Sequence, residues 1–259
     1  TWKDQPFSTG FGLTQIWKTA MAMDNTTRAT VLKYEPNEFA RIWREKLIEH
    51  KFDIETSLLF GSQGTVDSIN YTEGAVDFIT GYGNIFSGSG MGGTGSKAQD
   101  DFLDDMSNFL DPRYNNANAT LFMVSTDVYN WLHKLSGYFT ANMQKTDLGS
   151  SNRFAGRSDF SIGGKKNVFG VDITQIYTPY GVMNVSRNIH LDGTGIKMLA
   201  INMKYCSYRP LVGNGLNRDT AVYVGVQTLE NSGVDRRVDL IQTEAGMEWQ
   251  MPEAHAVWK

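Results

Sequence analysis

The sequence predicts an α+β fold, because helical and strand-like segments do not alternate regularly along its 259 residues. The first observation is a stretch over 38–60 that contains no Gly or Pro and places apolar residues at helical spacing. The second is a series of short strand-like runs later in the chain, separated by turn signals. The third is the C-terminal part, where two long strand-like runs flank the turn "ENSGVD".

The chain opens with residues 1–35, which are polar and rich in Thr around the strand-like run "LTQIWKTAMAM". We interpret this segment as an extended arm rather than a core element. The stretch over 38–60 follows, and at about 1.5 Å per residue it predicts one helix longer than about 30 Å. Asn37 is expected to cap the start of this helix, and Gly61 to lie just beyond its end.

One stripe of the predicted long helix is apolar. Phe39, Trp43 and Leu47 belong to this stripe, with charged residues between them. We therefore predict that these three side chains form the core-facing side of the helix.

The middle of the chain holds two more amphipathic helices and several strands. Residues 61–95 are rich in Gly, Ser and Thr around a strand-like "AVDFI", and 140–167 read as a long polar loop. One helix is predicted over 98–110, with four aspartates on its solvated face, and another is expected to be capped by Ser125 after the strand "ATLFMV". The apolar faces of the two helices comprise Phe102, Leu103, Met106, Phe109 and Leu110 in the first, and Val128, Trp131, Leu132, Leu135 and Phe139 in the second.

The remaining segments are predicted to be strands. "VFGVDITQIY" and "GVMNVSRNI" are joined by the turn signal "TPYG", and "IKMLAINMKYCSY" reads as one further strand. The tail, "TAVYVGVQTL" and "RVDLIQTEAGMEWQMPEAHAVW", is expected to form long antiparallel strands.

Composition limits the classes of protein that the chain can belong to. Its net charge of −4 lacks the basic signature of a nucleic-acid-binding protein. The single Cys206 excludes an internal disulfide and a cysteine-cluster zinc site. No apolar run approaches the length of about 18 residues that a membrane span needs, and no secretory signal peptide opens the chain.

The glycine-rich segment "GSGMGGTGSK", residues 88–97, is the strongest candidate for a nucleotide site. It fits the pattern GxGxxG, but Ser96 separates Gly95 from Lys97, so the spacing of a phosphate-binding P-loop is absent. The acidic residue of a dinucleotide fingerprint should follow a strand, whereas Asp111 follows a predicted helix. We therefore interpret the segment as a flexible tether that binds no phosphate.

No other pattern predicts catalysis, a cofactor or a metal site. The four histidines are scattered, no GxSxG motif occurs, and no Gly or Glu flanks the aspartates to complete a calcium loop. Glu244 and Glu248 favour salt bridges over acid–base chemistry, which needs two carboxyl groups in different environments. The chain is not expected to be an enzyme.

Several stretches resemble the major capsid proteins of tailed bacteriophages, whose Johnson fold is shared with encapsulins and herpesvirus capsid floors. "GFGLTQIWKTAMAMDNTTRA" resembles a strand of the extended loop, and "EFARIWREKLIEHKFDIETSLLFG" the spine helix. "ATLFMVSTDVYNWLHKL" is similar to a strand and helix of the axial domain, and "TEAGMEWQMPEAHAVW" to the last strand of the peripheral domain. Only part of the family's arm and extended loop precedes the helix, which is consistent with a late start of the sequence, cleavage or truncation.

The resemblance implies a domain layout. Residues 1–35 would form the arm and extended loop, 36–97 the peripheral domain with the spine helix, 98–215 the axial domain, and 216–259 the final peripheral strands. Its implied contacts between subunits involve four charged residues near the C-terminus, Arg236, Arg237, Glu244 and Glu248. Because successive strand residues point to opposite faces, one of the two arginines is expected to pair within the subunit and the other across an interface.

The function implied by the resemblance is that of a structural subunit. Hexamers and pentamers of the chain would form an icosahedral shell in the virion, assembled in the host cytoplasm around double-stranded DNA. Partners would be other copies of the chain, portal, scaffolding and decoration proteins, and packaged DNA bound weakly without sequence specificity, with no membrane. An encapsulin-like compartment is the alternative, and a nucleotide-binding enzyme that uses residues 88–97 is the third hypothesis.

Overall fold

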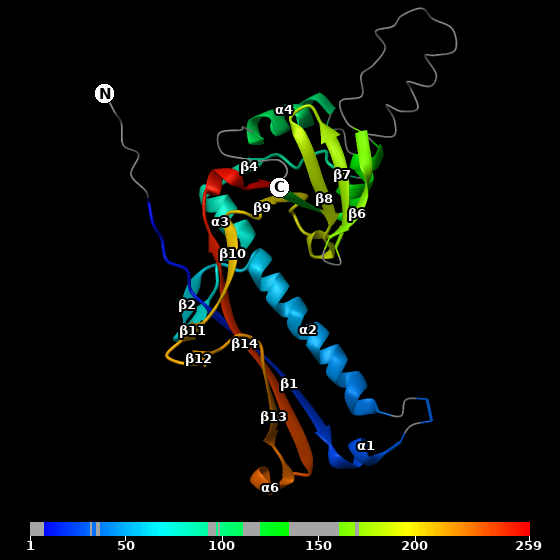
Figure 1. The fold of residues 1–259 in the computed structure, drawn as a ribbon, viewed down its shortest axis with the longest axis vertical. Coiled ribbons are helices and arrows are strands. Elements are labelled where there is room, and N and C mark those ends of the chain that lie inside the picture. The colour runs from blue at the N-terminus through cyan, green and yellow to red at the C-terminus, as the bar shows by residue number, and fades with distance from the viewer. Residues whose placement is uncertain are drawn as a thin grey trace, which may run out of the picture. The chain divides into compact units, whose positions relative to one another are not determined.

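The computed structural model describes residues 8–31, 33–34, 37–92, 97, 99–110, 120–134, 161–168 and 171–259. It divides into two compact units (Figure 1). Unit 1 comprises residues 1–77 and 208–248, and unit 2 comprises 78–207 and 249–259. The unit boundaries therefore differ from the domain boundaries predicted at 97/98 and 215/216, and the last eleven residues belong to unit 2.

Unit 1 is built on a four-stranded sheet and one long helix. The sheet has the order β1–β14–β10, and β13 also pairs with β14. Two separate hairpins, β2–β3 and β11–β12, complete the unit. Its elements are β1 (Gln15–Asp24), α1 (Asn25–Ala29), α2 (Glu38–Phe60), β2 (Gly64–Val66), β3 (Ile69–Tyr71), β10 (Cys206–Pro210), β11 (Val212–Gly213), β12 (Leu216–Asn217), β13 (Ala221–Gln227), α6 (Leu229–Ser232) and β14 (Arg236–Trp249).

The segment predicted to be an extended arm is partly a core strand. β1 pairs antiparallel with β14 over its full length, from Gln15 opposite Ala245 to Asp24 opposite Arg236. Every second side chain of β1 is buried, and the list of these residues is Trp17, Thr19, Met21 and Met23. The arm interpretation is therefore wrong for β1, because the period-two pattern places one face of the strand inside the unit.

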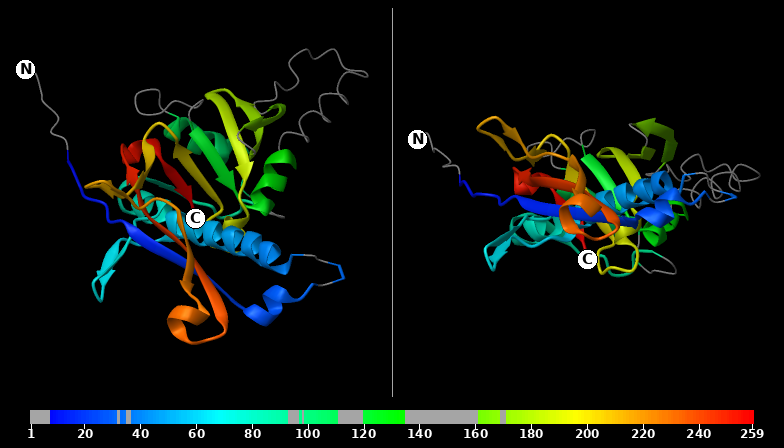
Figure 2. Two further views of the ribbon diagram at one scale, coloured as in Figure 1. Left: turned by 60° about the horizontal axis from the view of Figure 1, so that its bottom comes forward. Right: turned by 90° about the horizontal axis from the view of Figure 1, so that it is seen from below.

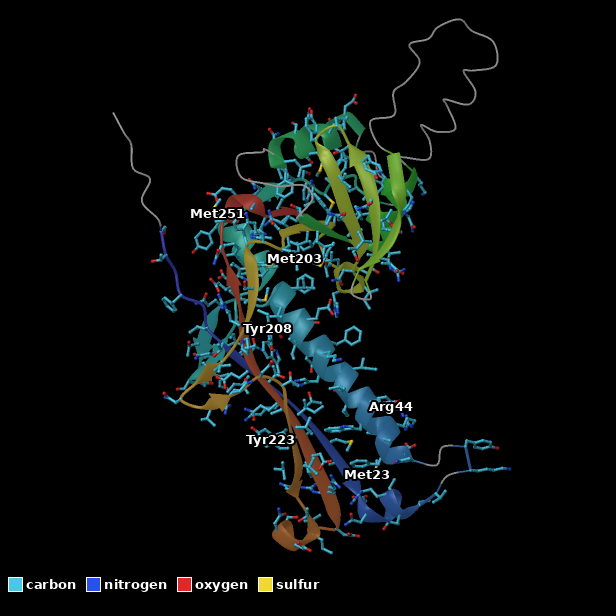
Figure 3. All side chains as sticks on the ribbon, viewed as in Figure 1. Met23, Arg44, Met203, Tyr208, Tyr223 and Met251 are labelled. Atoms are coloured by element: carbon cyan, nitrogen blue, oxygen red, sulfur yellow. The ribbon has the colours of Figure 1, made fainter. Side chains whose placement is uncertain are left out.

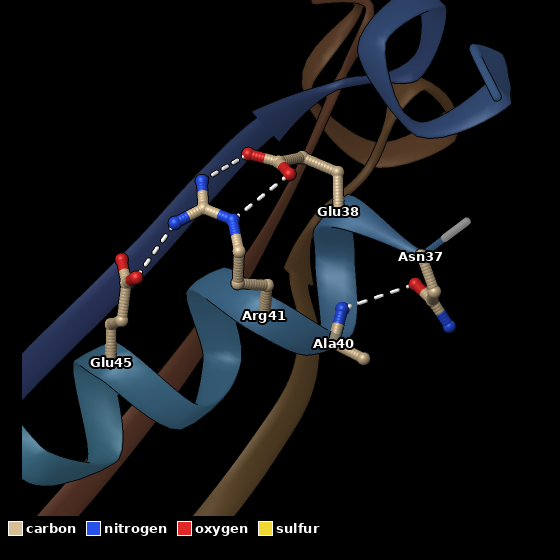
Figure 4. A network of polar contacts seen from close by, with 5 residues as sticks. All are labelled: Asn37, Glu38, Ala40, Arg41 and Glu45. Atoms are coloured by element: carbon tan, nitrogen blue, oxygen red, sulfur yellow. Dashed lines mark hydrogen bonds and ion pairs between the residues drawn. The ribbon is translucent and has the colours of Figure 1, made fainter. Parts of the chain in front are cut away.

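The long helix has the predicted bounds, and its first turns are stabilised by polar contacts (Figure 4). Asn37 caps the helix by accepting a hydrogen bond from the Ala40 N–H at 3.1 Å. The Arg41 guanidinium donates to Glu38 and, at 2.6 Å, to Glu45. The hydrogen bond from Arg41 lowers the pKa of Glu38 below its ordinary value. Pairs at these spacings support the helix by a few tenths of a kcal/mol each, about 0.2–0.5.

The end of α2 differs slightly from the sequence prediction. Gly61 is itself the C-cap residue and has an extended backbone, and its N–H donates to Ser57 O at 2.8 Å. The helix therefore ends without a residue in the left-handed conformation at Gly61.

A buried polar chain joins α2 to the sheet. The two ring nitrogens of His50 lie 2.9 Å from Thr19 Oγ1 and 2.8 Å from Thr243 Oγ1. Thr243 continues the chain to Thr220 at 2.9 Å. His50 is only 1% exposed, and the two hydroxyl groups provide hydrogen-bond partners for both of its ring nitrogens. The sequence did not predict that this ring lies in the core.

The predicted apolar stripe of α2 is only partly buried. Phe39, Trp43 and Leu47 are half-buried, whereas the fully buried residues of the helix are His50 and Leu59. The first three residues are therefore less buried within one chain than the sequence predicts.

Unit 2 is built on a seven-stranded mixed sheet with the order β4–β15–β9–β5–β8–β7–β6. β15 pairs parallel with β4 and β5 pairs parallel with β8, and the other neighbours are antiparallel. A further helix covers residues 126–134. The remaining elements are α3 (Ala75–Tyr82), which begins in unit 1, β4 (Asn84–Phe86), α4 (Gln99–Phe109), β5 (Thr120–Val124), β6 (Ser161–Val168), β7 (Val171–Thr178), β8 (Gly181–Arg187), η2 (Ile189–Leu191), β9 (Met198–Asn202), η3 (Pro252–Ala254) and β15 (Ala256–Trp258).

The core of unit 2 confirms both predicted amphipathic helices. Phe102 of α4 contacts Trp131 of the 126–134 helix edge to face, with 5.5 Å between ring centroids. Both helices pack with the sheet in one cluster of buried apolar side chains. Leu135 and Phe139 lie outside the described residues.

Four local predictions for unit 2 and its boundaries need correction. "AVDFI" belongs to helix α3, with Ala75 and Ile79 fully buried one turn apart, so tertiary burial overrides strand propensity. The run "IKMLAINMKYCSY" is two strands, β9 and β10, in two different sheets. β6 occupies part of the predicted 140–167 loop.

The fourth correction concerns the cap of the helix over 126–134. The Ser125 hydroxyl is buried, and no described residue forms a hydrogen bond with it. Instead, Asp192 accepts from the Thr126 N–H at 2.6 Å and from the Thr126 hydroxyl at 2.7 Å. These two hydrogen bonds lower the pKa of Asp192, as expected for a carboxylate at a helix N-terminus.

Candidate functional site

The glycine-rich segment is attached to the core of unit 2 where the structure describes it. The Gly88 N–H donates to Lys259 O at 2.8 Å, and Met91 is buried. A Cβ added at Gly88 would lie 3.1 Å from the backbone of Trp258 and Lys259, which is tighter than usual, so this position favours glycine. The tether interpretation is therefore wrong for residues 88–92, and Gly93–Ser96 and Ala98 lie outside the described residues.

The Lys97 ammonium is bound by groups of the protein itself. It donates to Ser87 O at 2.8 Å and to the Asp105 carboxylate at 2.5 Å, and the lysine side chain is only 8% exposed. Asp105 also accepts from the Trp258 indole N–H at 3.0 Å, so one of the four aspartates predicted to be solvated points inward. A lysine committed in this way cannot serve as the phosphate ligand of a nucleotide site.

His255 is a structural residue of unit 2. The Asn202 N–H donates to His255 Nδ1 at 3.2 Å, so the ring proton lies on Nε2, which donates to Gln250 O at 3.1 Å. Phe78 and Trp249 contact the ring, with centroids 6.2 and 5.7 Å away. Burial lowers the pKa of His255 below its ordinary value of 6.5, and burial also lowers that of His50.

We expect acid to destabilise the protein through these two histidines. A lowered pKa in the folded state means that the unfolded chain binds the proton first. The stabilisation is therefore present above about pH 6.5 and is lost as the pH falls toward the lower pKa of the folded state. Melting temperatures measured between about pH 7.5 and 5.5 should fall, and His255→Gln should reduce that fall because its amide does not titrate. An undiminished fall in the variant would contradict this role of His255.

The described residues also limit two other kinds of site. No three His, Cys, Asp or Glu side chains among them are grouped closely enough to hold a metal ion. None of the helices formed by these residues has the length and apolar character needed to cross a membrane.

The two glutamates that were predicted to contact other subunits each form a salt bridge within the chain. Glu244 pairs with Arg218, accepts from the Thr14 hydroxyl at 3.4 Å, and is only 9% exposed. Glu248 pairs with Arg209. The expected salt-bridge role is confirmed for both glutamates, and Glu244 is largely buried within the chain.

Arg237 points into unit 1. Its Nε donates to Asp239 at 2.9 Å, and its guanidinium lies 5.2 Å from the centre of the Phe39 ring. Arg28 lies 5.4 Å from the centre of the same ring. The aromatic ring thus contacts two cations, a favourable arrangement for a half-buried guanidinium.

Arg236 differs from its neighbour. Its Nη2 donates to the Gln227 amide oxygen at 2.7 Å, and its Nε is buried and has no hydrogen-bond partner among the residues that the structure describes. Within the described part of the chain, no carboxylate pairs with this guanidinium. The Arg237 guanidinium already pairs with Asp239, so Arg236 is the one of the two arginines that can still bind a carboxylate.

Sequence reasoning missed Asp239, which organises this part of unit 1. The residue is 2% exposed and accepts from both the Arg237 guanidinium and the Gly225 N–H, the latter at 2.7 Å. One signal was available, because Asp239 occupies an inward position between apolar residues of the strand-like run "RVDLIQ". Its partner on β13 could not be read from the sequence.

Comparison with known proteins identifies one matching family model. The model is described as SU10 major capsid protein, and it matches residues 10–259. No curated protein sequence matches the chain.

Solved structures share the fold. The chain is similar to the SrpI encapsulin of Synechococcus elongatus PCC 7942, with a TM-score of 0.55 and 9% identity over 95% of this chain and 73% of that one. It is similar to the capsid protein of an empty GTA particle, with a TM-score of 0.54 and 11% identity over 100% and 80% of the two chains. For Mycobacterium phage Che8 the values are 0.54 and 11%, over 95% and 70%. These likenesses confirm the fold predicted from the sequence, which phage capsids and encapsulins share.

Proposed function

Since the chain belongs to the SU10 major capsid protein family, we propose that hexamers and pentamers of it form an icosahedral tailed-phage shell around double-stranded DNA. Family membership makes the chain a structural protein of the virion. The observation that carries the proposal is the match of the family model over residues 10–259. The encapsulin alternative is less well supported, because likeness at 9% identity reports only a fold that both classes share.

Each unit has features that suit a shell subunit. We propose that unit 1 is the peripheral domain, with α2 as a stiff spine of about 35 Å, and that unit 2 is the axial domain. Portal, scaffolding and decoration proteins remain proposed partners. The net charge of −4 supports weak, non-specific contact with packaged DNA. The occupied Lys97 argues against the nucleotide-enzyme hypothesis.

Electron microscopy of the purified chain tests the shell proposal. Closed particles, or rings of five and six subunits, are expected on concentration. The nucleic-acid content of particles from infected cells separates a phage shell from an encapsulin-like compartment. A chain that stays monomeric under all assembly conditions, with no rings, would contradict the proposal.

We further propose that Arg236 pairs with a carboxylate of a neighbouring subunit. Its guanidinium lacks a carboxylate within the described chain, and arginine suits bidentate contacts with carboxylates. An exposed pair contributes only about 0–1 kcal/mol. A closed shell repeats each contact many times, so a small loss per contact is multiplied in assembly.

Arg236→Glu is expected to give a folded subunit that does not form closed shells. The matched control is Arg44→Glu, the same charge change at an exposed position of α2 (Figure 3). Circular dichroism should report wild-type folding for both variants, and microscopy should find shells only for the control. Normal shells from Arg236→Glu would refute the contact. Arg237→Glu is unsuitable for this test, because it places a carboxylate beside the buried Asp239.

A further inference from the structure

The hairpin β11–β12 ends in an exposed Asn-Gly turn. Asn214 and Gly215 join its two strands, and their φ angles are 50° and 78°. Two successive residues with positive φ form the tight hairpin turn in which Asn followed by Gly is favoured. Every residue from 211 to 217 is exposed, and the hairpin projects from unit 1 (Figure 2). An Asn-Gly pair occurs only once in the sequence.

The reactive groups of this turn are not engaged. Within the described part of the chain, the side chain of Asn214 has no hydrogen-bond partner, and the Gly215 N–H donates to no acceptor. Glycine has no Cβ, so nothing on Gly215 itself crowds its backbone nitrogen. The nitrogen and the neighbouring side-chain amide are therefore free to react with each other.

The hairpin is anchored at its base and not at its turn. Its strands pair over only two residues each. At the base, the Leu211 N–H donates to Glu244 O and the Arg218 N–H donates to Leu211 O, both at 3.0 Å. An exposed turn with so few contacts can open locally while the sheet of unit 1 stays intact.

Another asparagine with a small residue after it, Asn231, is held by the fold. Its side-chain oxygen accepts from the Thr228 N–H at 2.7 Å, and its amide nitrogen donates to Val226 O at 3.2 Å. The backbone N–H that follows it, on Ser232, donates to Thr228 O at 3.0 Å. Both groups that would have to react at Asn231 are therefore engaged.

Asn217 gives the closest comparison, because it lies in the same hairpin. Its side-chain oxygen accepts from the Asp219 N–H at 2.9 Å. The backbone N–H that follows it belongs to Arg218 and is the one that donates to Leu211 O at the base of the hairpin. Exposure is thus shared by the two asparagines of the hairpin, whereas freedom from hydrogen bonds is not.

We propose that Asn214 is a site of spontaneous deamidation in the folded protein. The backbone nitrogen of Gly215 attacks the side-chain carbonyl carbon of Asn214, so that a new C–N bond forms and the bond to the side-chain NH₂ breaks. Ammonia leaves with the proton of the Gly215 N–H, and a cyclic imide remains. Water then opens the imide at either carbonyl carbon, which gives aspartate or isoaspartate. Water is the one reagent consumed, and no electron is transferred.

The reaction changes the charge of the hairpin and, where isoaspartate forms, adds a methylene group to its backbone. No charged residue occurs from Leu211 to Asn217, so the new carboxylate is the only charge in this segment. It follows Val212 and precedes Leu216, which are 62% and 66% exposed. The chain therefore gains, with age, a negative charge on a surface that is uncharged when it is made. The inference concerns the single chain and does not rest on the proposed shell function.

Peptide mapping by mass spectrometry tests the proposal after the folded protein has been incubated in warm, mildly alkaline buffer. Trypsin should release residues 205–218 as one peptide, because it does not cleave before Pro210, so Asn214 and Asn217 are compared within the same peptide. Conversion of amide to acid should be more than about tenfold greater at Asn214, because the groups at Asn217 must first be released from two hydrogen bonds. The conversion should be faster at higher pH, since hydroxide removes the proton of the attacking nitrogen.

Asn214→Gln is the test variant, and Asn217→Gln is the matched control. Glutamine would have to form a larger ring, so the first variant should lose the conversion in this peptide and the second should keep it. The same incubation in urea should add conversion at Asn231, because unfolding removes the hydrogen bonds that hold it.

The comparison of folded and unfolded protein decides the outcome. Conversion at Asn214 in the folded protein, absent from Asn214→Gln, would support the proposal. Conversion at Asn214 in urea alone would show that the turn protects the site and would overturn it. Equal conversion of Asn214 and Asn217 in the folded protein would also overturn it, because the hydrogen bonds would then not select the site.

Discussion

Trp258→Ala is expected to lower the free energy of unfolding by about 3–5 kcal/mol, the range for large-to-small changes at buried aromatic residues. Trp258 is fully buried on β15, which lies between β4 and β9. Its ring stacks on Phe86 with 4.9 Å between centroids and meets the edge of Phe109 at 5.9 Å. Alanine would leave a cavity and would also remove the indole N–H from the Asp105 carboxylate.

Chemical denaturation followed by circular dichroism measures this effect. Trp43→Ala is the matched control, since it removes the same side chain from a half-buried position on α2. Its cost should be clearly smaller. Equal losses for the two variants would mean that Trp258 is not packed in the core as the structure describes.

Lys97→Met is expected to lower the free energy of unfolding by about 3 kcal/mol, because it leaves a partly buried carboxylate without its cation. The Lys97 side chain is 8% exposed and that of Asp105 is 20% exposed, so water compensates the loss poorly. The double variant Lys97→Met with Asp105→Asn should recover part of the loss, since the amide oxygen can still accept from Trp258.

Lys46→Met controls for the loss of a lysine in general. Lys46 pairs with Glu49 on the exposed side of α2, where such pairs are worth about 0–1 kcal/mol. Calorimetry with ATP is the companion measurement, and no saturable binding is expected for the wild type. A stability equal to the wild type in Lys97→Met, together with ATP binding that this variant loses, would restore the nucleotide hypothesis.

The elements with strong local signals were predictable from the sequence. α2 has the predicted bounds of 38–60 because a cap residue, the absence of Gly and Pro and one apolar stripe act within a few residues of each other. The inward faces of α4 and of the 126–134 helix were predictable for the same reason. "AVDFI" was mistaken for a strand because five residues hold too little pattern, and the burial of Ala75 and Ile79 decides their conformation.

The candidate contacts were only partly predictable. Alternation along a strand implied that Arg236 and Arg237 serve different partners, and Arg237 has one inside unit 1. The same pattern could not show that Glu244 is buried, nor that Asp239 accepts a hydrogen bond from β13. The Asn-Gly pair at 214–215 was visible in the sequence, but its exposure was not.

By itself, the sequence determined the α+β class, the long helix and, through resemblance, the capsid family that the family model confirms. These features rest on periodicity and composition, which are properties of short segments. Only the tertiary structure decided which polar groups meet: Lys97 with Asp105, Glu244 with Arg218, and Asp192 with the helix start at Thr126. Such partners lie 8, 26 and 66 residues apart in the sequence, and a charged group pairs with the group that folding brings close to it, which a linear pattern does not contain.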